Sequence, residues 1–273
     1  MTTRFINIAA SAKQSVGHRL ARRRFVSSLR PTDVFIVTFP KSGTRWLGFF
    51  LASIIAQKQS QLQSSPLTVT DYGGLVHDVN RQYHTLTPLN EFDGLLDPRI
   101  FTVHASWDSS LPNVIYLVRD PRAVLVSYYH HFEIVDGSFN RSMSDFISSP
   151  PQDWNSHVRS WLEHADSERL LLLRYEDLHA DPTRYFRDVA DFAHIPTSEV
   201  ELASAIDRSR FDNMRRVEDL TQDLTKYADP SGRFVRKGKV DSWRDELSPE
   251  QIKLIEERNK TLMEQLGYER DCD

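Results

Sequence analysis

"TFPKSGTRWL", residues 38–47, is the stretch that decides the expected fold of this 273-residue chain. It stands between two apolar runs, VFIV at 34–37 and FFLA at 49–52. A short, unbroken apolar run is typical of a strand buried on both faces of a parallel sheet. The stretch therefore predicts a strand, a tight turn and a helix, and such sheets bind their ligands beyond the carboxyl ends of the strands.

The same alternation continues along the chain. Strands are expected at 33–39, 100–103, 113–118 and 170–173, and helices at 44–59, 122–135 and 181–192. Strands that alternate with helices indicate a three-layer α/β fold, with a central parallel sheet flanked by helices and a P-loop-like turn after the first strand.

The end of the chain carries the clearest helix signals. Ser248 is a capping serine, Pro249 takes the first helical position, Gln251 the third, and Gly267 stops the run. Segments 60–98 and 136–155 contain Pro, Ser, Asn and Gly with scattered aromatic residues, so we expect loops there, over one edge of the sheet.

Bulk composition limits the classes of function. The net charge of −4 argues against nucleic acid as the main partner. Cys272 is the only cysteine, so no intrachain disulfide can form, which favours a reducing, cytoplasmic location. The longest mostly apolar stretch, residues 46–56, is about half of what a bilayer crossing needs, so no transmembrane helix is expected.

The first 32 residues differ from the rest in charge. Seven basic residues precede the first acid, Asp33. An acid-poor, Arg-rich leader is either a solvated basic arm or a targeting or membrane-surface segment. The sequence therefore predicts a basic arm at 1–32, flexible or targeting, and a single domain at 33–273.

The chemistry of the first turn favours a phosphate-bearing ligand. A loop that opens a helix offers backbone N–H groups and the positive end of the helix dipole. Gly43 permits close backbone approach, Ser42 and Thr44 add hydroxyl groups, and Lys41 adds a positive charge. The nucleotide P-loop GxxxxGK[ST] places its lysine after the second glycine. Here the lysine precedes the glycine, which disfavours an ATP-dependent kinase.

The turn resembles the phosphosulfate-binding loop of the cytosolic-type sulfotransferases, P-K-[ST]-G-T-x-W. The resemblance implies 3′-phosphoadenosine-5′-phosphosulfate (PAPS) as co-substrate. It places the backbone amides, Ser42 and Thr44 on the phosphate, and Lys41 toward the bridging oxygen. Trp46 stacks on the adenine in this family, and Arg45 departs from the family's small hydroxyl residue, with its orientation left open.

Four later segments extend the resemblance. In YLVRDPRAVLVSYYHHF, Arg119 and Ser127 match the family's ligands of the 3′-phosphate. The second of these segments, FVRKGKVDSW, resembles the family's R-K-G-x-x-G-D-W segment, which lies over the nucleotide. Asp241 and Ser242 depart from this pattern. We expect the segment to be a mobile lid. LLLRYEDLHADP and RSRFDNM match segments near the adenine. The residues that match in these last three segments are Arg236, Lys237, Gly238, Trp243, Tyr175, Ser209 and Phe211.

The resemblance also implies a catalytic histidine at His104, which ends the run RIFTVH. Histidine is the commonest general base, and a lysine beside the bridging oxygen stabilises the leaving group. The family's K-[ST]-H pattern lacks its lysine here, because Thr102 and Val103 precede His104. The pair His130 and His131 is interpreted as pocket wall.

The sequence therefore predicts a PAPS-dependent sulfotransferase that acts on a hydroxyl or amine of a small molecule. Catalytic roles fall to His104 and Lys41, no metal is expected, and a homodimer is left open. An aromatic wall is expected for the acceptor, from Tyr72, Tyr83, Phe92, Trp107, Phe132 and Phe139. The alternatives are an ATP-dependent small-molecule kinase of related fold and a non-catalytic nucleotide-binding or membrane-recruitment protein.

Overall fold

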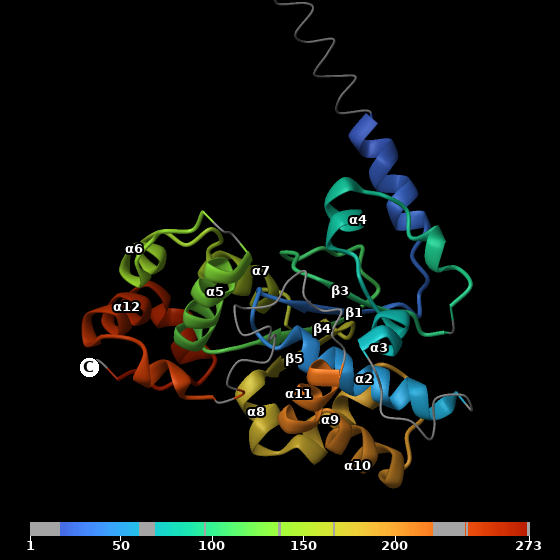
Figure 1. Ribbon diagram of the computed structural model, residues 1–273. Coiled ribbons are helices and arrows are strands. Elements are labelled where there is room, and N and C mark those ends of the chain that lie inside the picture. Colours follow the sequence, from blue (N-terminus) through green and yellow to red (C-terminus); the bar gives the residue numbers. More distant parts are fainter. Residues whose placement is uncertain are drawn as a thin grey trace, which may run out of the picture.

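The computed structural model contains one five-stranded, wholly parallel sheet in the order β2-β3-β1-β4-β5 (Figure 1). It describes residues 17–59, 69–95, 97–135, 138–165, 167–220, 238 and 240–271. The strands are β1 Val34–Thr38, β2 Val76–Asp78, β3 Ile100–Val103, β4 Asn113–Val118 and β5 Leu170–Arg174.

The central strand is β1, and all five of its residues are buried. Val34 pairs with Ile100 of β3 on one side and with Asn113 of β4 on the other. Since the three strands are parallel and nearly in register, their carboxyl ends lie at one edge of the sheet. The loops that carry Lys41, His104 and Arg119 start there.

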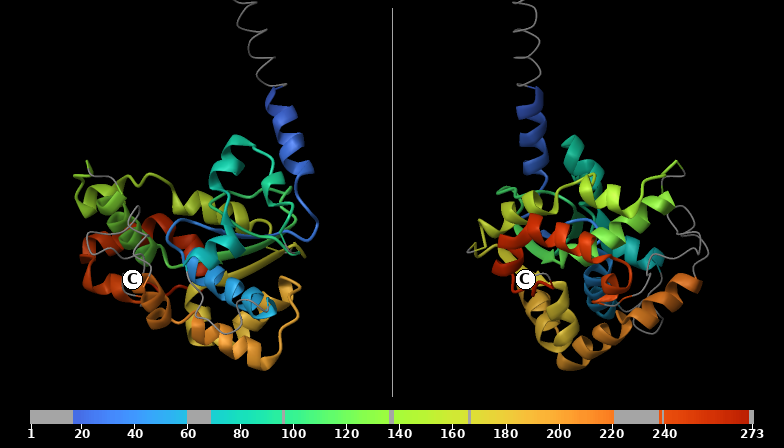
Figure 2. Two further views of the ribbon diagram at one scale, coloured as in Figure 1. Left: turned by 45° about the vertical axis from the view of Figure 1, so that its right-hand side comes forward. Right: turned by 90° about the vertical axis from the view of Figure 1, so that its left-hand side faces the viewer.

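Helices cover both faces of the sheet (Figures 1 and 2). The core of one face includes α2 Thr44–Lys58, α8 Tyr175–Ala180, α9 Pro182–Phe192, α10 Glu199–Arg208 and α11 Phe211–Leu220. The core of the other includes α5 Pro121–Val135, α6 Met143–Ser148, α7 Trp154–Leu162 and α12 Pro249–Gln265. The three-layer α/β class is confirmed, and the predicted strands and helices lie within two residues of their observed bounds.

The loop prediction for segments 60–98 and 136–155 is wrong in part. The first contains α3 Val69–Leu75, β2, α4 Asn80–Thr85 and the 3₁₀ helix η1 Asn90–Phe92; the second contains α6 and the start of α7. These elements are short, and helices of six or seven residues form through tertiary packing rather than through propensity. A three-residue edge strand likewise leaves almost no periodic signal.

The predicted cap of the last helix is present. Ser248 Oγ accepts the N–H of Gln251 at 3.3 Å, and Gln251 Oε1 accepts the N–H of Ser248 at 2.8 Å. Pro249 occupies the first helical position, and Gly267 follows the helix with φ +71°. Between β5 and α12 the chain also forms the short 3₁₀ helix η3 Ser242–Asp245.

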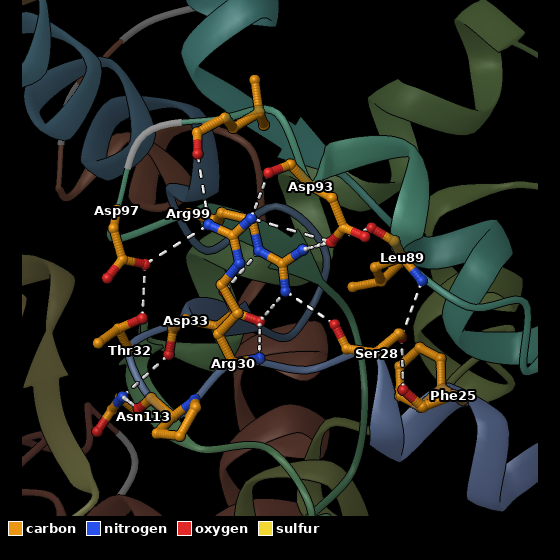
Figure 3. Close-up of polar contacts among 12 residues, drawn as sticks. Phe25, Ser28, Arg30, Thr32, Asp33, Leu89, Asp93, Asp97, Arg99 and Asn113 are labelled. Carbon is orange, nitrogen blue, oxygen red and sulfur yellow. Dashed lines mark hydrogen bonds and ion pairs between the residues drawn. The ribbon is translucent and has the colours of Figure 1, made fainter.

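A buried ion pair joins the amino ends of β1 and β3 (Figure 3). Asp33 and Arg99, which directly precede these strands, have side chains with 0% exposure. Arg99 forms a two-pronged contact with Asp33, from Nε at 2.7 Å and from Nη2 at 2.6 Å, and Nη2 also donates to Ser28 O at 2.9 Å. The pair therefore ties the two strands and the preceding chain together at the edge opposite the predicted site.

No helix within the described ranges has the length and apolar character needed to cross a bilayer. The described part of the basic arm packs on the domain, because Phe25 has 0% exposure.

Candidate active site

One cavity of about 1280 Å³ lies at the carboxyl ends of β1, β3 and β4. Its lining includes most of the residues predicted from the sequence: Lys41, Gly43, Thr44, Arg45, Trp46, His104, Arg119, Ser127, Tyr175, Ser209, Phe211 and Gly238. Arg236 and Lys237 lie outside the described residues. The structure therefore brings six separated stretches of the sequence together around one cavity, at 41–46, 104, 119–127, 175, 209–211 and 238.

The turn after β1 has an unusual backbone. Lys41 has φ +73° and Gly43 has φ +108°, both in the left-handed region. A Cβ at Gly43 would lie 2.7 Å from the Tyr175 ring, so only glycine fits. A non-glycine residue such as Lys41 at positive φ is uncommon and costs free energy. The turn leads directly into α2, whose N-cap residue is Gly43. Since glycine has no side chain, no side-chain hydrogen bond caps the start of this helix.

Two hydroxyl groups of the turn lie differently. Thr44 Oγ1 lies 2.7 Å from Thr38 Oγ1 and lines the cavity. Ser42 has 0% exposure, does not line the cavity, and its Oγ has no hydrogen-bond partner among the described residues. The contact of the Ser42 hydroxyl with a ligand phosphate stays a prediction.

Arg119 follows β4 and faces the turn. Its Nη1 donates to the backbone oxygen of Lys41 at 3.3 Å, and its Cζ lies 4.2 Å from the centroid of the Tyr175 ring. The neighbouring carboxylate of Asp120 pairs with Arg122 at 2.7 Å instead. Arg119 is thus held between the turn and an aromatic ring, and Ser127 of α5 lines the same cavity.

His104 is fixed by three hydrogen bonds. Its Nδ1 lies 2.8 Å from Thr38 O and 3.2 Å from Thr38 Oγ1, and its backbone N–H donates to Asn80 Oδ1 at 2.7 Å. A carbonyl oxygen only accepts, so Nδ1 carries the proton and Nε2 keeps a lone pair. Burial lowers the pKa of His104, and nearby Lys41 and His84 lower it by smaller amounts. The hydrogen bond to Thr38 and the charge of Asp78 raise the pKa, but the net change is a lowering. The ring is therefore neutral at pH 7.

Sequence reasoning missed the residues that position His104. Asn80 donates its side-chain N–H at 2.8 Å and its backbone N–H at 2.9 Å to Asp78 Oδ1. Asp78 also lines the cavity and ends β2. The Asp-x-Asn spacing is a local turn signal, but it was not used because β2 itself was not predicted.

The predicted acceptor wall is partly present. Tyr72, Phe92, Phe132 and His131 line the cavity. Burial, with Lys41, Arg45 and His104 nearby, lowers the pKa of His131 to about 4, and burial raises the pKa of Tyr72 to about 12.

Other residues expected in that wall lie elsewhere. His130 is within 2.7 Å of Glu133 and 2.6 Å of Glu246 and does not line the cavity. Three of the predicted aromatic residues pack in other clusters: Tyr83 on Phe25, Trp107 on Trp161 and His164, and Phe139 on Tyr129 and Phe132. Sequence alone does not separate such core rings from lining rings.

The opposite end of the cavity is aromatic. The Trp46 ring centroid lies 4.4 Å from that of His179 and 5.2 Å from that of Tyr175. Gly238 has φ +60°, and a Cβ there would lie 2.1 Å from the Phe211 ring. Gly238, which belongs to the segment FVRKGKVDSW, is therefore packed against the predicted base pocket. Ser209 also lines this end, and its hydroxyl donates to Ile206 O at 2.9 Å.

Comparisons with known proteins test the family resemblance that the sequence motifs suggest. A model of the sulfotransferase domain matches residues 31–267. The amine sulfotransferase of Oryctolagus cuniculus is 25% identical over 82% of this chain and 78% of its own length, and the flavonol 3-sulfotransferase of Flaveria bidentis is 26% identical over 92% and 86%.

Two solved structures share the fold. Mouse sulfotransferase SULT7A1 complexed with PAP has a TM-score of 0.65 at 21% identity, covering 88% of this chain and 89% of its own. Retinol dehydratase in a complex with retinol and PAP has a TM-score of 0.64 at 22% identity, covering 86% and 82%. With the family model spanning most of its length, this chain belongs to the sulfotransferase domain family.

Proposed function

We propose that this protein transfers a sulfuryl group from PAPS to a hydroxyl or amine group of a small molecule. The observation that carries the proposal is the convergence of the Lys41 turn, Arg119, Ser127 and Gly238 on one cavity that also contains His104. A donor with phosphate groups on both the 3′ and the 5′ position of its ribose needs cationic and amide groups from separated segments, and the lining of this cavity supports such a donor. Similar proteins solved with PAP support the same donor.

The residues present fit such a donor. The turn has positive φ angles at Lys41 and Gly43 and leads into the start of α2, where the first backbone N–H groups of a helix suit an anion such as the 5′ phosphosulfate. The Arg119 guanidinium, with Ser127, suits the 3′-phosphate, because its planar array of donors matches a dianion. The rings of Trp46 and Phe211 offer faces for the base. PAPS supplies an activated sulfuryl group.

His104 and Lys41 have complementary roles in the proposed reaction. With Nδ1 held by the Thr38 carbonyl, Nε2 of His104 accepts the proton that the attacking hydroxyl or amine loses. The ammonium of Lys41 stabilises negative charge at the phosphate oxygen from which the sulfuryl group departs. Asn80 and Asp78 act as positioning residues, because they fix the backbone of His104.

Sulfate transfer separates this proposal from the alternatives. Incubation with PAPS carrying labelled sulfate and a panel of phenols, alcohols and amines is expected to label at least one acceptor. Titration calorimetry with adenosine 3′,5′-bisphosphate and with MgATP gives a second test, and tighter binding of MgATP would favour the kinase alternative. Bisphosphate binding without any transfer would favour a non-catalytic nucleotide-binding protein.

Arg119→Ala is expected to weaken the binding of adenosine 3′,5′-bisphosphate roughly 30- to 150-fold, or about 2–3 kcal/mol, the scale of charge-assisted hydrogen bonds. Calorimetry measures this loss directly. Arg169→Ala, at an exposed arginine outside the cavity, is the matched control and should leave affinity unchanged. Equal affinity in the Arg119 variant and the wild type would remove Arg119 from the donor site.

His104 is expected to titrate below its ordinary pKa of 6.5 in the ligand-free protein, because burial disfavours the imidazolium. The ring is then neutral above that midpoint and gains its proton only as the pH falls below it. A titration of imidazole ¹⁵N chemical shifts, assigned with His104→Gln, measures both the midpoint and the tautomer. A midpoint above 6.5, or a proton on Nε2, would contradict the proposed role.

A further inference from the structure

Residues 17–27 form a helix that projects from the domain beside α4 in every view (Figures 1 and 2). Its inner side is anchored. Phe25 has 0% exposure and meets the ring of Tyr83 edge-on, with centroids 5.8 Å apart. Arg22 pairs with Asp108 and donates to Ser110 Oγ at 3.1 Å. The helix is therefore held in place by the core while its other side faces outward.

The outward side is basic and carries a large apolar side chain, Leu20. Arg19, Arg23 and Arg24 are exposed, and no ion pair to any of them is found in the parts of the chain that the structure describes. Leu20 is 51% exposed among them. Spacings of four residues bring Arg19 beside Arg23 and Leu20 beside Arg24. A hollow of about 360 Å³, lined by Leu20, Arg23, Arg24 and Ser27 together with Pro88 and Asn90, lies at this side.

The charge of the whole chain makes this side the favoured contact with an anionic surface. The first 32 residues carry seven basic and no acidic side chains, a charge of +7, so the remaining residues carry −11. An acidic body is repelled by a negatively charged surface unless its basic end approaches first. The distribution of charge therefore favours an orientation in which the basic N-terminal residues face such a surface.

We propose that helix 17–27 docks this protein on an anionic phospholipid membrane through Arg19, Leu20, Arg23 and Arg24. Arginine side chains near a negative membrane surface gain attraction, and an exposed leucine enters the boundary between headgroups and acyl chains. A nucleic acid would instead call for a broad basic face, whereas the rest of this chain is acidic. The inference depends on the helix and its charge, and it is independent of the reaction in the cavity.

Flotation of the full-length protein with lipid vesicles tests the proposal. Vesicles of equal parts phosphatidylcholine and phosphatidylserine are compared with vesicles of phosphatidylcholine alone, at an ionic strength of about 0.1 M, where the Debye length is about 10 Å. The wild type is expected to bind the anionic vesicles and not the neutral ones. The triple variant Arg19→Gln, Arg23→Gln, Arg24→Gln is expected to lose about 100-fold in partitioning.

A charge-matched control keeps the result specific. Arg169→Gln, Arg184→Gln, Lys260→Gln removes three exposed cations elsewhere and should keep vesicle binding. Binding of adenosine 3′,5′-bisphosphate, measured in parallel, should be equal in the wild type and both variants, which shows that they are folded. If the Arg19 triple variant loses folding, single Arg→Gln variants at 19, 23 and 24 are each expected to lose a few fold.

Four outcomes would overturn the proposal. Equal binding to neutral and anionic vesicles would exclude an electrostatic dock. Equal losses in the two triple variants would assign binding to net charge rather than to this helix. Displacement of the protein from vesicles by inorganic phosphate, at a concentration equal to that of the lipid phosphate, would assign the basic side to a small anion. Binding to RNA without binding to vesicles would assign it to nucleic acid.

Discussion

Replacing His104 by alanine is expected to lower kcat for sulfuryl transfer by about 10²–10⁴-fold, the usual contribution of a positioned general base. Affinity for adenosine 3′,5′-bisphosphate should stay unchanged, because the proposed donor contacts come from Lys41, Arg119 and Ser127. The size of the loss follows from the geometry: Nδ1 is committed to Thr38 O at 2.8 Å, and the lowered pKa keeps Nε2 ready to accept a proton at pH 7.

Initial rates of labelled sulfate transfer, at saturating donor and acceptor, measure this effect. His164→Ala is the matched control, since His164 is exposed, stacks on Trp107 at 4.1 Å and does not line the cavity. His131→Ala tests the rival base in the same cavity, whose pKa of about 4 makes it the weaker base. A large loss of kcat in His131→Ala, with His104→Ala active, would move the catalytic role to His131.

The central part of the fold was predictable because it depends on strong local signals. The runs at β1, β3 and β4 are apolar and short, and the helices that follow β1 and β4 are each 15 residues long. The capping box at Ser248 is local, so it could be identified without the fold. The edge strand β2 and helices α3, α4 and α6 depend on contacts with distant segments, which a local pattern does not contain.

The site shows the same division. Lys41, Gly43 and Arg119 belong to motifs in which the residues are close in sequence, and the structure places them around one cavity. Asn80 accepts the backbone N–H of His104, and Asp78 holds Asn80, only because β2 pairs with β3. In this pairing Val76 lies beside Ile100 and Asp78 beside Thr102. Ser42 matches the motif by its sequence position, but its hydroxyl is buried and does not line the cavity, which a local sequence pattern does not reveal.

Arg99→Met is expected to lower the free energy of unfolding by about 3–5 kcal/mol, because it leaves a buried carboxylate without its cation. Asp33, with 0% exposure, would keep the backbone N–H of Arg30 at 2.8 Å but lose the two contacts from Arg99 (Figure 3). The carbonyl of Ser28 would lose its donor as well. Urea denaturation followed by tryptophan fluorescence measures the change.

Arg30→Met provides the comparison within the same cluster. The Arg30 side chain is 29% exposed and lies 3.7 Å from Asp97 and 3.9 Å from Asp93, so its loss should cost about 1 kcal/mol or less, as for exposed ion pairs. Similar small losses in both variants would show that the aliphatic stem of Arg99, rather than its charge, matters at this position.

The double variant Asp33→Asn, Arg99→Met separates the stranded charge from the lost packing. If the cost of Arg99→Met comes from the buried carboxylate, neutralising Asp33 should recover part of it, and the two changes together should cost less than their sum. Because Asp33 and Arg99 precede the strands whose far ends carry Thr38 and His104, the same double variant should keep the register of β1 and β3. Its His104 tautomer, measured by ¹⁵N shifts, should then match the wild type, whereas an altered tautomer would show that the ion pair also sets the geometry at the opposite edge of the sheet.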